Sequence, residues 1–372
     1  MVVLRLRLWP VVSQTANTLV AKASAALAEG TPESNQRAVT LCERAIDADP
    51  RCVPAYVGLA NAYLERAREL RLGPRWLERA VEVGEKALEL DSYTPEGYVA
   101  LGLAYHAKGM LGREQKLWLR RVEIDPSDAS ARAREGWVLW FTGRPDEALG
   151  WLNAAAQQAE NRWVQSWVYF FLGNANLALG DYAEAESMYR KQLNLNPDHS
   201  SAQAGVIWAL LAASKDKEAR HQLSRFEMNP YDGDRYPLKL ADIEYFLGED
   251  GKAAAHAHDA LAEPDERYWP RGFLASTILG SVLWSSDRSA AVTQLRASEQ
   301  IDRQRLEGED EGYMPHIDLA AIYAVRDEPR AACRSLRAAI AAGWRYPALA
   351  VRDRLFESLR TDREFISLVG GA

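Results

Sequence analysis

Residues 169–197 constrain the fold most, because they contain two short amphipathic segments separated by a helix stop. In the first segment Tyr169, Leu172 and Gly173 recur at three- and four-residue spacing, which places them on one face of a helix. The dipeptide Gly180-Asp181 predicts the end of this helix, since Gly tolerates the left-handed conformation that helix C-termini favour.

A second helical segment follows the turn, with Ala185, Tyr189 and Leu193 on one face and Pro197 as its stop. Small residues at Gly173 and Ala185 allow the two helices to approach closely. Neither helix can bury its apolar face alone, so each pair requires another pair beside it. The sequence therefore predicts a stack of antiparallel helix pairs.

The stretch resembles a tetratricopeptide repeat, a unit of about 34 residues with the pattern W-x2-L-G-x2-Y, then A-x3-F, then P. The residues in its signature positions are Tyr169, Leu172, Gly173, Ala185, Tyr189 and Pro197. Asn176 departs from the Tyr position. Similar segments recur along the chain, for example at Tyr56–Tyr63 and Tyr98–Tyr105. The resemblance implies an all-α fold, a right-handed superhelical solenoid of antiparallel helix pairs.

The repeats divide the chain into four predicted parts. Residues 1–13 form an N-terminal segment or linker end, with a short strand possible within 1–12. Residues 14–306 form the array, with about eight helix pairs. Residues 307–312 are an acidic connection, and 313–372 hold a final repeat and capping helices. Caps are expected because an open stack exposes apolar surface.

The net charge of -7 and the pI of about 5.6 argue against nucleic acid or an anionic membrane as the main partner, although a local basic patch is compatible with them. No apolar run reaches the length of a transmembrane helix, so we expect no membrane span and a cytoplasmic location. Cys42, Cys52 and Cys333 lack metal-ligand spacing and are expected to be reduced packing residues.

The motifs of common catalytic sites are missing from the sequence. No phosphate loop, nucleophile elbow, zinc motif or dinucleotide-binding motif is present. His256 and His258 are two residues apart on a predicted helix, hence on different faces, which suits one metal ion poorly. We therefore expect no catalytic residue, no metal site and no cofactor.

The family resemblance implies a concave groove lined by the first helix of each pair, and aromatic residues occupy many of its positions. The predicted partner-binding residues are Asn61, Trp137, Trp140, Phe141, Trp167, Phe170, Asn174, Trp208, Tyr245 and Phe246. A row of rings over several repeats predicts that Trp137, Trp140, Trp167, Phe170 and Trp208 are partly accessible to solvent. The alternative, that a given ring packs between helices, stays open.

These observations favour a non-catalytic scaffold that binds a peptide or a partner helix. Two alternatives stay open. Residues 319–340 and 354–369 resemble the end of repeat arrays in bacterial winged-helix regulators, adenylate cyclases and serine/threonine kinases, so the chain could be a regulatory module of such a protein. It could also be an enzyme or enzyme subunit whose array binds glycan or peptide. The oligomeric state is left open by the sequence.

Overall fold

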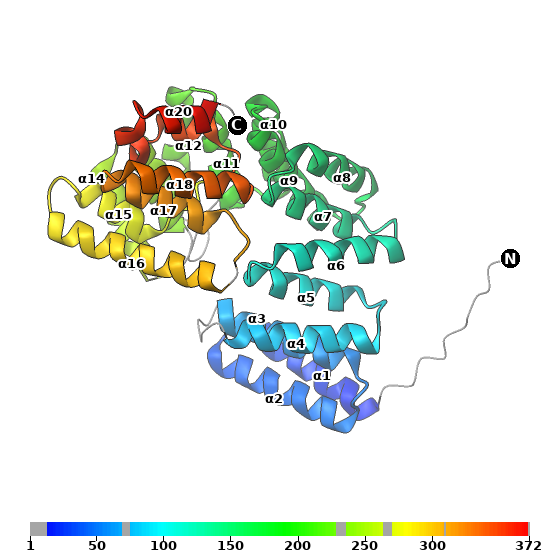
Figure 1. Ribbon diagram of the computed structural model, residues 1–372. Coiled ribbons are helices and arrows are strands. Elements are labelled where there is room, and N and C mark those ends of the chain that lie inside the picture. The colour runs from blue at the N-terminus through cyan, green and yellow to red at the C-terminus, as the bar shows by residue number, and fades with distance from the viewer. Residues whose placement is uncertain (1–12, 69–74, 228–235, 263–269, 309, 371–372) are drawn as a thin grey trace. The chain divides into compact units, whose positions relative to one another are not determined.

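The computed structural model describes residues 13–68, 75–227, 236–262, 270–308 and 310–370. Every regular element in these residues is a helix, so the predicted all-α class is confirmed (Figure 1). The possible strand within residues 1–12 lies outside the described residues. Within the described ranges, no helix has both the length and the apolarity needed to cross a membrane.

The chain forms two compact units, Met1–Pro126 and Ser127–Ala372, and their boundary falls inside the predicted array. The first unit contains six helices among its described residues: α1 (Gln14–Leu27), α2 (Pro32–Ala48), α3 (Val53–Arg68), α4 (Arg75–Leu90), α5 (Pro95–Ala107) and α6 (Leu111–Ile124). Consecutive helices pack against each other, as expected for a stack of antiparallel helix pairs.

The second unit begins with α7 (Ala129–Phe141), α8 (Pro145–Gln158), α9 (Arg162–Leu179), α10 (Tyr182–Leu195), α11 (Ser200–Ala212) and α12 (Asp216–Glu227). It continues with α13 (Tyr236–Phe246), α14 (Asp250–Ala260), α15 (Ala275–Leu283), α16 (Arg288–Glu307), α17 (Met314–Val325) and α18 (Pro329–Ala341). Three short elements end it: α19 (Pro347–Arg352), the 3-10 helix η1 (Arg354–Leu359) and α20 (Arg363–Gly370).

The turn between α9 and α10 shows how the sequence ends the first helix of a pair and begins the second. Gly180 ends α9 in the left-handed conformation with φ 84°, and the Asp181 N–H donates to the Asn176 carbonyl. The Asp181 side chain then accepts from the Glu184 N–H and caps α10. The predicted Gly-Asp stop is therefore one tight turn that ends one helix and begins the next.

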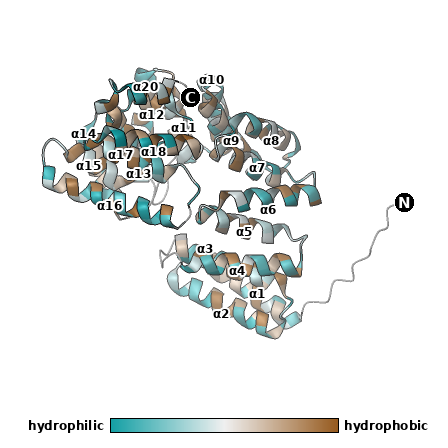
Figure 2. Cartoon of the chain, viewed as in Figure 1, coloured by the Kyte–Doolittle hydropathy of each residue, from teal (hydrophilic) through white to brown (hydrophobic). Residues whose placement is uncertain are grey.

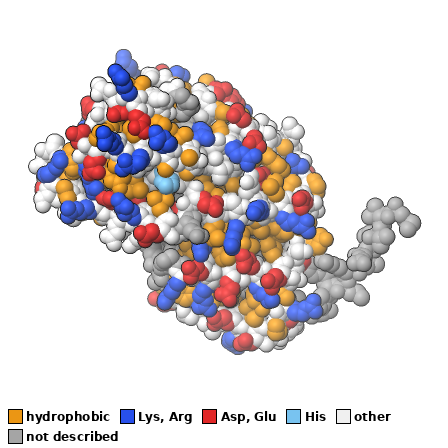
Figure 3. Space-filling model, viewed as in Figure 1, with side chains coloured by type: hydrophobic (Ala, Val, Ile, Leu, Met, Phe, Trp, Pro, Cys, Tyr) orange, Lys and Arg blue, Asp and Glu red, His pale blue; other side chains and the backbone are white. Residues whose placement is uncertain are grey.

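Most helices carry both apolar and polar residues, with the apolar ones on one face that is buried and the polar ones on a face that is solvated (Figure 2). On the visible face, Lys and Arg side chains are interspersed with Asp and Glu (Figure 3). Helix α11 differs, because every residue from Ala204 to Ala212 is buried. The helix is therefore enclosed by other parts of the second unit, and Trp208, a predicted binding residue on α11, is buried with it.

Glycines mark the closest approaches between paired helices, as the small-residue positions predicted. A Cβ atom on Gly173 would lie 2.5 Å from the Tyr189 ring, and one on Gly102 would lie 2.3 Å from the Trp118 ring. A Cβ on Gly136 would lie 2.6 Å from Leu152. Each distance is shorter than carbon–carbon van der Waals contact, so these positions leave no space for a side chain.

We expect Gly173→Ala to lower the free energy of unfolding by about 1–3 kcal/mol, because the new methyl group must displace the buried Tyr189 ring. Gly150→Ala in α8 is the matched control, since nothing lies within 4 Å of the added carbon. There the higher helix propensity of Ala should raise stability by up to about 1 kcal/mol. Denaturant unfolding of both variants measures the difference, and equal stability of the two would show that α9 and α10 are not in close contact at Gly173.

Candidate functional site

Four aromatic residues on α7 and α9 form a partly exposed surface together with His199 at the start of α11. We name Trp137, Trp163, Trp167, Phe170 and His199 the α7–α9 aromatic surface. Trp163 is 59% exposed, and Trp137, Trp167 and Phe170 are half-buried. The surface thus retains apolar area that water can reach.

Ring contacts fix the geometry of this surface. Trp167 lies at the centre, 6.0 Å from Trp163 and 6.2 Å from Phe170 between ring centroids, in edge-to-face contacts. The His199 ring lies 5.6 Å from Trp167 and 5.2 Å from Phe170. Such networks hold rings in fixed orientations, so little side-chain entropy is left to lose when a ligand binds.

Phe171 connects α9 to α7 beneath the surface. Its ring is buried and stacks on Trp137 at 5.6 Å with an interplanar angle of 5°. A shallow cleft lies above it, lined by Ser130, Ala133, Arg134, Trp163, Val164, Trp167 and Phe171. The Arg134 guanidinium lies 5.5 Å from the Trp137 ring. The cleft therefore combines aromatic walls with a cationic edge.

The prediction that Trp140 and Trp208 are accessible is wrong. Trp140 is 4% exposed, and its indole N–H donates to the Tyr346 hydroxyl at 3.0 Å. Trp208 is 0% exposed; the Phe246 ring lies 5.5 Å away and the Arg271 guanidinium 5.3 Å away. Both indoles are packing residues of the second unit.

The chain's own C-terminal segment, residues 344–359, covers several predicted binding residues of the second unit, among them Trp140. Tyr245 and Phe246, also predicted to bind a partner, are buried beneath it. The Arg354 guanidinium lies 4.9 Å from the Tyr245 ring, and that of Arg352 lies 5.5 Å from the Phe246 ring. An external partner cannot contact these rings while the segment stays in place.

Ion pairs attach this segment to α12 and α14. Arg352 donates to both carboxylate oxygens of Asp216, at 2.6 and 2.8 Å. Arg354 pairs with Asp250 at the start of α14. The Arg354 pair is bidentate, with one guanidinium nitrogen on each Asp250 oxygen, whereas a single Arg352 nitrogen contacts both oxygens of Asp216.

A third ion pair lies at the centre of the second unit. Arg271 contacts Asp242 at 2.8 Å and Asp353 at 2.5 Å, and all three side chains are at most 3% exposed. One guanidinium thus faces two carboxylates. Burial raises the pKa of Asp242 to about 7, although Arg271 opposes this shift, and burial also raises the pKa of Asp353.

The other predicted residues have mixed surroundings. Asn174 is buried and accepts a hydrogen bond from the Tyr189 hydroxyl at 2.9 Å, so it holds α9 to α10. Phe141 is half-buried, 5.2 Å from the Tyr313 ring. Asn61 is exposed but belongs to the first unit. These three residues therefore do not join the α7–α9 aromatic surface.

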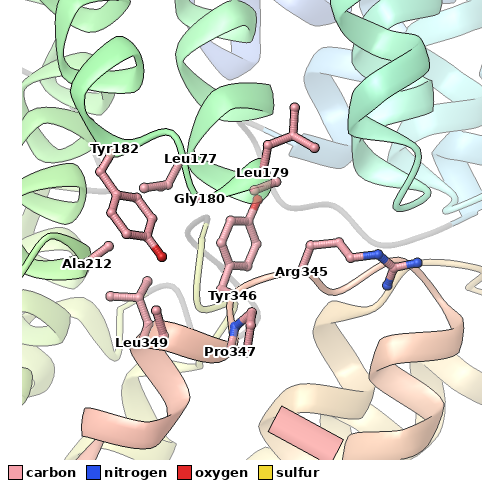
Figure 4. A pocket seen from close by; sticks show the side chains of 11 residues that line it. Leu177, Leu179, Gly180, Tyr182, Ala212, Arg345, Tyr346, Pro347 and Leu349 are labelled. Carbon is pink, nitrogen blue, oxygen red and sulfur yellow. The ribbon is translucent and has the colours of Figure 1, made fainter. Parts of the chain in front are cut away.

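A pocket of about 210 Å³ lies at the opposite end of α9 from Trp163 (Figure 4). The α9–α10 turn, Ala212 and residues 345–349 line it, and the Tyr182 and Tyr346 rings stand in its walls. Leu177 and Ala178 of α9 belong to the pocket and also continue the helical face of Trp167 and Phe170. The same face of α9 thus begins with exposed rings and ends in a pocket.

Sequence reasoning missed Trp163, which stands before the repeat signature of α9, although it lies four residues before Trp167 and hence on the same helical face. It also missed the covering segment. The signal for that cover is the all-round apolar character of α11, which is typical of a helix buried on every side.

Comparisons with known proteins agree with this architecture. Residues 129–161 and 168–199 each match a family model described as tetratricopeptide repeat. No curated protein matches the sequence.

Solved structures with the same fold include a tetratricopeptide repeat protein from Parabacteroides merdae, 14% identical, which covers 73% of this chain and 100% of its own, with a TM-score of 0.56. A monomeric mutant of IFIT1 with m7Gppp-AAAA is 14% identical over 87% of this chain and 80% of its own, with a TM-score of 0.50. A tetratricopeptide repeat protein from Thermus thermophilus is 23% identical over 53% of this chain and 99% of its own, with a TM-score of 0.42.

The two matched segments fall on the pairs α7–α8 and α9–α10. Together with the helix pairs and the repeat signatures, they show that the chain contains tetratricopeptide repeats.

Proposed function

We propose that the protein is a non-catalytic interaction scaffold that binds a peptide or partner helix on the α7–α9 aromatic surface. The observation that carries this proposal is the 59% exposure of Trp163 beside the half-buried Trp167. Stacked repeats form extended concave surfaces that suit elongated partners. The proposal retains Trp137, Trp167 and Phe170 from the sequence prediction and adds Trp163.

Energetics support these rings as anchors. Large aromatic side chains supply contact area with few rotatable bonds, and a few such anchors usually carry most of the affinity of an interface. The rings of the α7–α9 aromatic surface already hold one another in place, so binding costs less ordering entropy.

The accessible part of α9 limits the length of the contact. Its partly exposed rings run from Trp163 to Phe170, which at 1.5 Å per residue is about 10 Å. About three residues of an extended peptide, or about two turns of a partner helix, have this length. Asn174 and Leu177, farther along the same face, are buried and do not extend it.

Site-specific photo-cross-linking tests the proposal. A benzophenone amino acid replaces Trp163 in the full chain, and a matched variant carries it at Ala183, an exposed position on α10 outside the aromatic surface. We expect cross-linked peptides from position 163 to be enriched about tenfold over those from position 183, and unlabelled Trp163→Ala protein to compete poorly for the same partner. Equal products at both positions, or full competition by Trp163→Ala, would contradict the proposal.

A further inference from the structure

A second cluster of aromatic and cationic side chains lies in the first unit, where α3 packs against α4. The Tyr63 and Trp76 rings lie 5.3 Å apart. The guanidinium carbons of Arg66, Arg75 and Arg79 lie 4.5, 5.0 and 5.4 Å from the Trp76 ring centroid. We name these five residues the arginine–tryptophan cluster.

Two buried hydrogen-bond donors of the cluster have no acceptor among the described residues. One is the hydroxyl of Tyr63, whose side chain is 1% exposed, and the other is the buried indole N–H of the half-buried Trp76. Unpaired buried polar groups are rare in folded proteins, because each forfeits its bond to water without replacement. Two such donors on contacting rings indicate an acceptor that the described part of the chain does not supply.

The positive charges of the cluster also indicate that it binds an external acceptor. Arg66 is nearly buried, and it donates to the neutral side-chain oxygens of Asn35 and Gln36 at 2.7 and 2.6 Å. Arg75 and Arg79 are exposed, and neither forms an ion pair with a carboxylate in the described part of the chain. Three guanidinium groups around one ring repel one another, so an anion would stabilise the arrangement.

Acidic residues around the cluster offset this charge only in part. Glu43 on α2 acts electrostatically on Tyr63 and Arg66. Glu65 on α3 accepts a hydrogen bond at 2.8 Å from the amide nitrogen of Asn35, whose amide oxygen accepts from Arg66. Neither carboxylate forms an ion pair with Arg75 or Arg79, so the two exposed guanidinium groups stay available to a ligand.

We propose that the arginine–tryptophan cluster binds a phosphoryl group, as free phosphate or on a phosphorylated side chain. A phosphoryl group carries nearly two negative charges and several acceptor oxygens, which suits several guanidinium groups and two further donors. A carboxylate offers one charge and two oxygens and would leave part of the cluster unpaired. The exposed Arg75 and Arg79 provide the entrance, and the half-buried Trp76 forms the floor.

Calorimetric titration of the full chain tests this site with inorganic phosphate, O-phosphoserine amide and O-phosphotyrosine amide as probes. We expect Arg75→Gln and Arg79→Gln each to weaken binding about tenfold. Arg44→Gln is the matched control, because Arg44 is an exposed arginine on α2 outside the cluster, and its affinity should be unchanged. Trp76→Phe keeps a ring but removes the N–H donor, so it should also weaken binding.

The three probes distinguish the source of the phosphoryl group. Equal affinity for all three indicates recognition of the phosphate alone, and tighter binding of an amide indicates a phosphorylated side chain. Equal affinity for acetate and phosphate, or equal weakening by Arg44→Gln, would overturn the proposal. A single-stranded oligonucleotide that binds with steep salt dependence while the three probes do not would assign the cluster to nucleic acid instead. Thermal unfolding is the folding control, since phosphate should raise the Tm of the wild type more than that of Arg79→Gln.

Discussion

Replacing Trp208 with Ala is expected to lower the free energy of unfolding by about 3–5 kcal/mol, the range for large aromatic side chains in a core. Trp208 is 0% exposed on α11 and packs against Phe246 and Arg271, so its removal leaves a cavity that the surrounding helices can fill only in part. Denaturant unfolding measures the loss.

Trp163→Ala is the matched control for this prediction. Because Trp163 is 59% exposed, its removal should change stability by no more than about 0.5 kcal/mol. If both variants unfold at the same denaturant concentration as the wild type, Trp208 is not part of the core.

Arg271→Met is expected to destabilise the protein by about 3–5 kcal/mol near pH 8, because it leaves the carboxylates of Asp242 and Asp353 buried without their cation. The loss should be smaller at pH 5. In the wild type the pKa of Asp242 is about 7, above its ordinary value of 3.8. Between these two pH values the folded state therefore holds a proton that the unfolded state has lost. The contribution of Asp242 to the free energy of unfolding is therefore largest at low pH and is lost as the pH rises through 7.

Without Arg271 the pKa values of both carboxyl groups should rise further, because the opposing charge is gone. Protonation at pH 5 then removes most of the penalty of two buried anions. Unfolding curves of wild type and variant at pH 5 and pH 8 give the comparison. A loss that is equal at both pH values, or larger at pH 5, would contradict the buried triad.

The sequence predicts the helix pairs well, because their determinants are local. The Gly180-Asp181 turn, the small residue at Gly173 and its contact with Tyr189 all follow from residues within one repeat. Periodicity and turn chemistry act over a few residues, so a single chain carries this information in full.

The exposure of the concave face could not be predicted in the same way. Trp208 packs against Phe246 and Arg271, which lie outside its own repeat. Whether Tyr245 and Phe246 are open or covered depends on Arg354 and Arg352 of residues 344–359, and on the ion pairs of these arginines with Asp250 and Asp216. A repeat signature places a side chain on the concave side of a pair but does not report what packs onto that side. The sequence prediction and the structure agree on the surface at α7 and α9, since Trp167 and Phe170 are partly exposed.

The central claim is that the predicted groove aromatics separate into an accessible surface, with Trp137, Trp167 and Phe170 on α7 and α9, and a covered core, with Trp140 on α7 and the rings of α11 and α13. The most direct measurement is the affinity of the peptide captured from position 163 for the full-length wild type and for Trp163→Ala, each checked for unfolding free energy. The account predicts that Trp163→Ala binds the peptide with a loss of about 2 kcal/mol, roughly thirtyfold, while its stability is unchanged. Wild-type affinity in a Trp163→Ala protein of wild-type stability would contradict it.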